Sequence, residues 1–316
     1  SRCDSASIAQ ITTPLPMAVL SVAGARIRTN NPLNPSEGYV VRAESRNSAT
    51  FFGSNPQLTF IKGIGDAAVY HQVRLGGVIA FRIRLGSIWG GADVGGAKQP
   101  PQQERLYAGG ASSVRGFQQN ELGSLLYVFD NGVTIHHVPP GPGTDSAVFF
   151  TLDSTARDRR VVPVGGNTLF VANLDYRVQS PFLPQLLQFT FFTDVGTVWN
   201  RNTQTNFGGF RPQWTPGIGL RVATPLGPIQ VNAGYNPYPP VFGQALFTPP
   251  RTLAAEGFTG VYCAVPTGTP NPPLSTFVNG AWVQEANVHC QPTFQPPPPK
   301  GWLQRLTFTF SIGPDF

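Results

Sequence analysis

The chain has 316 residues, of which only 12% are charged, and it contains 35 glycines and 32 prolines. A soluble globular domain carries about 25% charged residues, and a helical membrane protein has apolar runs of about 20 residues, which this sequence lacks. The 41% of hydrophobic residues argues against disorder over most of the length. The net charge of +6 comes from dispersed basic residues, so no nucleic-acid partner is expected. This composition favours a transmembrane β-barrel, whose strands alternate apolar and polar side chains.

Alternation with a period of two residues predicts nine antiparallel strands and an all-β fold. The last strand is the clearest, because Phe308, Phe310 and Ile312 alternate with Thr309 and Ser311. In chain order, the predicted strands are 17–28, 37–47, 57–70, 77–89, 166–178, 186–199, 213–223, 228–236 and 303–316.

The connections between these strands alternate in length, as tight periplasmic turns and long extracellular loops do in outer-membrane barrels. The short set is 29–36, 71–76, 179–185 and 224–227, and the other set is 48–56, 90–165, 200–212 and 237–302. We therefore expect residues 17–316 to be part of one barrel domain and residues 1–16 to be a loop remnant. Because an odd number of strands does not close a bacterial barrel of this type, we expect further strands to precede the chain.

Two cysteines, Cys263 and Cys290, lie in the second long loop. Outside the inner membrane, two cysteines of one loop pair more often than they stay free, so we expect a disulfide. A metal site that includes His289 lacks a fourth ligand at a standard spacing. The sequence has no G-x-S-x-G elbow, and His136 and His137 have no acidic or cysteine company. We expect no catalytic residue, no cofactor and no metal.

Four motifs occur in one order along the chain. They are RLYAGGASSVRGF at 105–117, FFTDVGTVW at 191–199, GIGLR with TPLGP at 217–228, and FTFSIG with the final Phe316 at 308–316. Together with the turn at 31–38, they resemble the BamA/TamA superfamily (the bacterial surface antigen superfamily) of outer-membrane assembly and translocation barrels. The resemblance extends from about Met17 to Phe316 and is specific, because the motifs occur in register.

The resemblance implies a site in the first long loop, formed by Val114, Arg115, Gly116 and Phe117. In the family, this arginine reaches an acidic residue on the inner wall of the barrel. The alternation of the predicted strands puts Asp194 and Asp175 on the inward face, and a guanidinium can bond one carboxylate with two hydrogen bonds. Alternatively, the two aspartates are solvated residues of the lumen. We expect Gly116 to permit the tight tip of the loop.

The resemblance also implies the C-terminal nine strands of a barrel with about sixteen strands, preceded by periplasmic POTRA domains. The expected function is insertion of β-barrel clients through a lateral seam between the first and last strands, in the bacterial outer membrane. The last-strand residues of this seam are Phe308, Phe310, Ile312, Gly313 and Phe316. Gly313 either kinks the strand or makes room for a neighbouring side chain.

Unfolded outer-membrane proteins and membrane lipid are the implied partners, with lipopolysaccharide and accessory lipoproteins as further candidates. The alternative functions are polypeptide export of the two-partner secretion type and passive diffusion through a porin. An integral outer-membrane location is common to all three.

Overall fold

The computed structural model describes residues 15–73, 76–94, 97–140, 146–153, 158–201, 209–224, 227–284 and 290–313. These residues form two compact units. The described residues of the large unit come from Pro14–Ser124, Gly165–Pro239 and Pro299–Phe316. The described residues of the small unit come from Leu125–Val164 and Pro240–Pro298.

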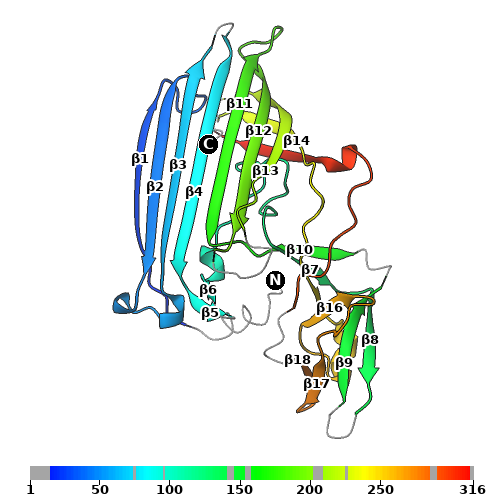
Figure 1. Cartoon of the computed structure of the whole chain (residues 1–316). Coiled ribbons are helices and arrows are strands. Elements are labelled where there is room, and N and C mark those ends of the chain that lie inside the picture. Colours follow the sequence, from blue (N-terminus) through cyan, green and yellow to red (C-terminus); the bar gives the residue numbers. More distant parts are fainter. Residues whose placement is uncertain are drawn as a thin grey trace. The chain divides into compact units, whose positions relative to one another are not determined.

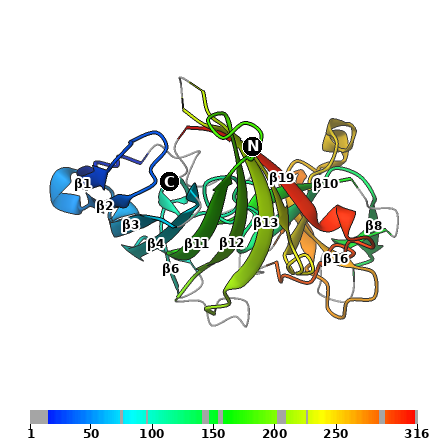
Figure 2. The ribbon, with the colours of Figure 1, turned by 90° about the horizontal axis from the view of Figure 1, so that it is seen from above.

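A nine-stranded antiparallel sheet forms the frame of the large unit (Figure 1). In the order of their hydrogen bonding, its strands are β1 (Leu20–Thr29), β2 (Gly38–Ser48), β3 (Phe60–Gln72), β4 (Val78–Gly90), β11 (Thr168–Gln179), β12 (Leu187–Trp199), β13 (Gln213–Val222), β14 (Ile229–Tyr235) and β19 (Leu306–Ile312). The first eight begin and end within three residues of a predicted strand, and β19 lies inside the predicted strand 303–316, of which 314–316 are outside the described residues, so the nine-strand prediction is confirmed. Figure 2 shows the same succession of strands from above.

The two faces of this sheet differ in chemistry, because alternate residues of a strand point to opposite sides. We call the face packed by residues 105–117 the inner face, and the opposite one the outer face. Large apolar side chains are exposed along the outer face, from strand to strand. They include Val22, Ile61, Val69, Phe81, Leu85, Phe191, Ile218, Val231, Phe308, Phe310 and Ile312. A continuous exposed apolar face suits contact with lipid.

Strands β1 and β19 are the two ends of this sheet. Within the described residues, β19 pairs with β14 on one side and with no strand on the other, and β1 pairs only with β2. The pairing of β14 with β19 is short, over seven residues, whereas β3 and β4 pair over thirteen. The last strand is thus an edge strand held by a short ladder.

The connection between β4 and β11 begins with a small hairpin, β5 (Ala92–Val94) and β6 (Ala97–Gln99), and then crosses the inner face. Val114 and Leu122 of this connection pack with Ile88, Val171 and Val198 of the sheet. Burial of these apolar side chains is what fixes the segment on the sheet.

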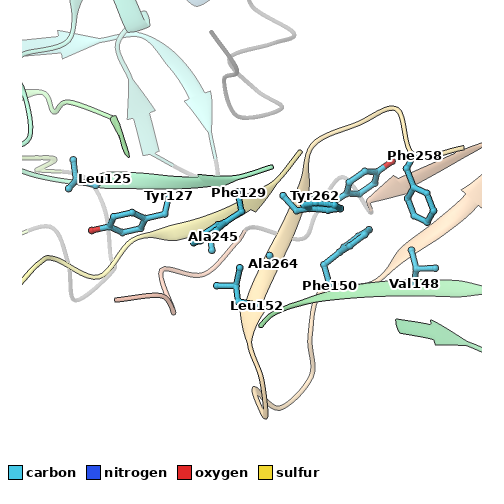
Figure 3. Packing of buried hydrophobic residues seen from close by; sticks show 11 residues of the cluster. Leu125, Tyr127, Phe129, Val148, Phe150, Leu152, Ala245, Phe258, Tyr262 and Ala264 are labelled. Carbon is cyan, nitrogen blue, oxygen red and sulfur yellow. The ribbon is translucent and has the colours of Figure 1, made fainter. Parts of the chain in front are cut away.

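The small unit was not foreseen as a folded element, because its segments were expected to be loops. Its described strands are β7 (Leu125–Phe129), β8 (Val133–Val138), β9 (Ala147–Leu152), β10 (Arg159–Pro163), β15 (Gln244–Phe247), β16 (Tyr262–Pro266), β17 (Ser275–Val278) and β18 (Ala281–Gln284). The two loops share one sheet, since β15 pairs parallel to β7 and β16 pairs parallel to β9. Aromatic side chains fill its core (Figure 3), where the rings of Phe150 and Tyr262 are 4.7 Å apart.

Helical structure in the described residues consists of short 3-10 turns. They are η1 (Thr50–Phe52), η2 (Pro56–Leu58), η4 (Gln102–Glu104), η5 (Arg251–Glu256) and η6 (Leu303–Arg305). Among the described residues, no helix has the length and apolar character needed to cross a membrane.

Candidate functional site

Residues 105–117, here called the signature segment, pair near their first end with Gly166 and with the chain that follows the segment. Leu106 pairs with Gly166 through two backbone hydrogen bonds of 2.9 Å. Leu122, just beyond the segment, donates its N–H to the carbonyl of Ala108 at 3.0 Å. Val114 lies at the tip and is completely buried. The tip is therefore part of the core of the large unit.

The guanidinium of Arg115 binds Asp194 of β12 with two hydrogen bonds. Its Nε donates to Oδ2 at 2.9 Å and its Nη2 donates to Oδ1 at 2.7 Å. The backbone N–H of Arg115 also donates to Asp194 Oδ2, at 2.8 Å. Only 4% of Arg115 and none of Asp194 is exposed. The carboxylate therefore fixes both the side chain and the backbone of the loop tip.

Asp175 of β11 supplies a second carboxylate to the same guanidinium. Arg115 Nη2 donates to Asp175 Oδ1 at 2.6 Å. The other oxygen of Asp175 lies 3.7 Å from Nη2 of Arg177, two residues along the same strand. The structure thus brings together the three charged residues that the sequence analysis singled out, and it adds Arg177 to them.

Burial alone would lower the pKa of the Arg115 guanidinium, because desolvation disfavours a charge. The carboxylates of Asp175 and Asp194 act in the opposite direction and prevail, so the pKa of Arg115 lies above its usual value. The arginine therefore stays charged and the site keeps its ionic bonds.

Asn173 completes the hydrogen bonding around Asp194, and the sequence analysis did not identify it. Its Nδ2 donates to Asp194 Oδ1 at 2.8 Å and to the carbonyl of Ser113 at 2.6 Å. Asn173 is buried and sits directly opposite Asp194 in the pairing of β11 with β12. Asn173 and Asp175 are two residues apart on the same strand, so both side chains point to the inner face. This alternation could have identified Asn173 from the sequence.

Phe192 is a second residue that the sequence analysis missed. The guanidinium carbon of Arg115 lies 3.6 Å from the centre of the Phe192 ring, within the range of a cation–π contact. Phe192 is buried on the inner face, whereas its neighbour Phe191 is exposed on the outer face. Because Phe192 and Asp194 are two residues apart, the same parity argument applies to both.

Gly116 was expected to permit a tight turn, but the structure gives a different reason for a glycine. A Cβ at this position would lie 2.5 Å from Cγ2 and 2.6 Å from Cβ of Thr215 on β13. The absent side chain thus allows the backbone to approach the inner face of the sheet. Phe117 follows it, half-buried, and packs against the same core as Val114.

Two further ionic clusters hold the signature segment and the residues before it, and neither was predicted. Arg82 of β4 binds Asp66 of β3 through a short ion pair, and its Nη1 donates to the carbonyl of Ser112 at 2.9 Å. Earlier in the chain, Glu104 accepts hydrogen bonds from Arg46 at 2.7 Å and from Lys62 at 3.2 Å. Charged side chains therefore bind this connection to the inner face at three places, namely Glu104, Ser112 and Arg115.

The residues predicted for the last strand lie as the alternation requires. Phe308, Phe310 and Ile312 are exposed on the outer face of β19. Gly313 follows the strand instead of lying inside it, and its φ of 114° is one that side chains rarely adopt. A Cβ there would have no atom of the described residues within 4 Å, so none of them needs the room that the glycine leaves. Phe316 lies outside the described residues.

The structure places the remaining candidates in the small unit. Cys263 and Cys290 form a disulfide, and the backbone N–H of Cys263 also donates to Gln284 Oε1 at 2.8 Å. His136 stacks on Phe149 at 4.6 Å and its Nε2 is 2.8 Å from Thr151 Oγ1. His289 lies outside the described residues, and the described part of the chain has no group of three potential metal ligands.

Comparison with known protein families gives one specific match. The Omp85 superfamily domain matches residues 18–238, which include the signature segment and both aspartates. The chain belongs to the Omp85 superfamily.

The fold of this Omp85 chain is similar to that of BamA from Haemophilus ducreyi, in a crystal structure lacking POTRA domains 1-3. The TM-score is 0.51 and the sequence identity is 20%, over 69% of this chain and 38% of that chain. The chain thus spans well under half of the BamA chain that it matches. The family and the fold together give an Omp85-type outer-membrane β-barrel protein.

Proposed function

We propose that this Omp85 protein assembles outer-membrane β-barrel proteins by presenting the edge of β19 to an incoming client strand. The observation that carries the proposal is the short ladder that holds β19 to β14, which spans only seven residue pairs. On the side away from β14, β19 pairs with no described strand, although its outward side chains are apolar. Backbone groups without partners in lipid cost several kcal/mol each, so when β19 separates from a neighbouring strand, pairing with a client strand is strongly favoured.

The packing of the inner face supports this proposal over a passive porin. A porin needs an inner wall that is lined with water. Here the wall formed by β11, β12 and β13 is covered by the signature segment, with Arg115 and Val114 buried against it. The mechanism uses backbone hydrogen bonds and needs neither catalysis nor a nucleotide.

The family also contains exporters, which move a polypeptide through the lumen, and the proposal has to be tested against that function. The intact gene product would be reconstituted in phospholipid vesicles and given a urea-denatured β-barrel client. Folded client in the vesicle membrane, seen as an unboiled gel shift above that of empty vesicles, is the expected result. Protease-protected client in the vesicle lumen would indicate export, and ion leakage without client would indicate a porin. Either outcome without membrane-folded client contradicts the proposal.

A further inference from the structure

The backbone of Arg115 and Gly116 contacts three neighbouring strands of the sheet. Thr215 of β13 lies against Gly116, as described above. On β14, a Cβ at Gly234 would lie 2.6 Å from the carbonyl oxygen of Arg115. On β19, the hydroxyl of Thr307 donates to the carbonyl oxygen of Gly116 at 3.0 Å. The signature segment therefore reaches the last strand directly.

The signature segment can come close to β19 because the residues next to each other across β13, β14 and β19 have small side chains or none. Gly217, Gly234 and Thr307 are directly opposite one another across β13, β14 and β19. The ring of Phe192 occupies the place beside Gly217, where a Cβ would lie 2.2 Å from Cζ. The Arg115–Gly116 peptide occupies the place beside Gly234. A side chain at Gly234 would displace the segment from Thr307, and one at Gly217 would collide with the ring of Phe192.

The bond between Thr307 and Gly116 is buried, with 8% of Thr307 exposed. It adds to a ladder that spans only seven residues, so it is a sizeable share of what holds β19. Thr309 lies two residues further on the same face of the strand. Its buried hydroxyl has no hydrogen-bond partner among the described residues, which makes it a natural comparison.

We propose that Thr307 is a latch between the signature segment and the edge strand, and that its release regulates when β19 leaves the sheet. This inference rests on the proposed function, because it concerns the same edge. Asp194 and Asp175 bind Arg115, the carbonyl oxygen of the adjacent Gly116 binds the hydroxyl of Thr307, and Thr307 is part of β19. Whatever displaces the signature segment also frees the last strand to pair with a client.

Hydrogen–deuterium exchange of the intact protein in lipid nanodiscs tests the latch without any client. Thr307→Val removes the hydroxyl and keeps the shape of the side chain. We expect it to speed exchange of the amides of Leu306–Ile312 by about three- to tenfold, the effect of losing one net hydrogen bond. Thr307→Ser keeps the hydroxyl and should stay within about twofold of the wild type.

Two controls separate a latch from a general loss of stability. Thr309→Val removes a hydroxyl that bonds nothing described and should leave exchange of β19 unchanged. Exchange in β3, an interior strand, should be the same in all variants. The inference is overturned if Thr307→Val leaves β19 exchange unchanged, if Thr307→Ser matches Thr307→Val, or if Thr309→Val has an equal effect. Because no client is present, a protein that fails to insert clients contradicts the proposed function and leaves this test intact.

Discussion

Arg115 and Asp194, 79 residues apart in the chain, meet through three hydrogen bonds of 2.7 to 2.9 Å. Two of the bonds come from the guanidinium and one from the backbone N–H of the arginine. The interaction thus joins a long connection to an interior strand of the sheet and fixes its orientation. In this membrane-barrel chain, the interaction between Arg115 and Asp194 stabilises the signature segment on the inner face of the sheet.

Breaking this pair should destabilise the protein strongly. Asp194→Asn leaves the buried Arg115 with Asp175 as its one carboxylate partner among the described residues, and removal of one charge from a buried pair costs about 3–5 kcal/mol. The midpoint of urea unfolding in detergent, followed on unboiled gels, measures the loss. Asp130→Asn is the control, because Asp130 and Arg160 form an ion pair in which both side chains are about half exposed. That change should cost less than about 1 kcal/mol, and equal costs for both variants would contradict the buried network.

Phe192 should contribute to the stability of the protein through the contact of its ring with Arg115, and not only through its size. Phe192→Leu keeps an apolar side chain but removes the ring below Arg115, so we expect a loss of about 1–2 kcal/mol in unfolding free energy. The matched control is Phe191→Leu, the adjacent phenylalanine on the exposed outer face. A larger effect at Phe191 in detergent would show that the cation–π contact carries little of the stability.

Gly116 should tolerate no side chain. Gly116→Ala would place a Cβ 2.5 Å from Thr215 Cγ2, and the strain should cost about 1–3 kcal/mol. Gly63→Ala on β3 is the control, because a Cβ there would have no atom of the described residues within 4 Å. The double variant Gly116→Ala with Thr215→Ser loses the methyl group that clashes and should recover part of the stability. Equal stability of Gly116→Ala and Gly63→Ala would contradict the close approach of Gly116 to Thr215.

The disulfide should stabilise the small unit. Its cysteines are 27 residues apart, and closing a loop of that length removes about 3–4 kcal/mol of chain entropy from the unfolded state. In a Cys3→Ser background, intact mass after alkylation should show no modified thiol before reduction and two afterwards. Reduction should also speed proteolysis between β16 and β18, while the β1–β4 region stays resistant. Free thiols in the native protein would contradict the bond.

The sequence predicted the nine-stranded sheet because lipid on one side and a polar interior on the other impose a period of two on each strand. It also predicted that Arg115, Asp194 and Asp175 would meet, since a motif supplied the arginine and parity supplied the acceptors. Asn173 and Phe192 share that parity but were overlooked, because an amide and an aromatic ring are not obvious partners of an arginine.

The small unit could not be predicted by the same reasoning. Its strands are mostly four to six residues long, too short for alternation to stand out. Its parallel pairs join segments more than one hundred residues apart, such as Tyr127 with Ala245. No pattern in the local sequence indicates that two such distant segments pair. The ion pair of Arg82 with Asp66 was missed for a related reason, since cross-strand proximity depends on a register that the sequence alone did not give.

The most direct test of the central claim is whether a client strand lies against β19 during assembly. A photo-reactive phenylalanine analogue would replace Phe308 of β19 or Ile218 of β13, in the intact protein, during assembly of a radiolabelled barrel client. Both positions are opposite Ala233 and face outward, with 68% and 60% of the side chain exposed, so they differ mainly in being on an edge strand or an interior one. We predict client cross-links at position 308 that appear and decay as the client folds, and few at position 218. Equal cross-linking at the two positions, or none at 308 while clients still assemble, would contradict insertion at the edge of the last strand.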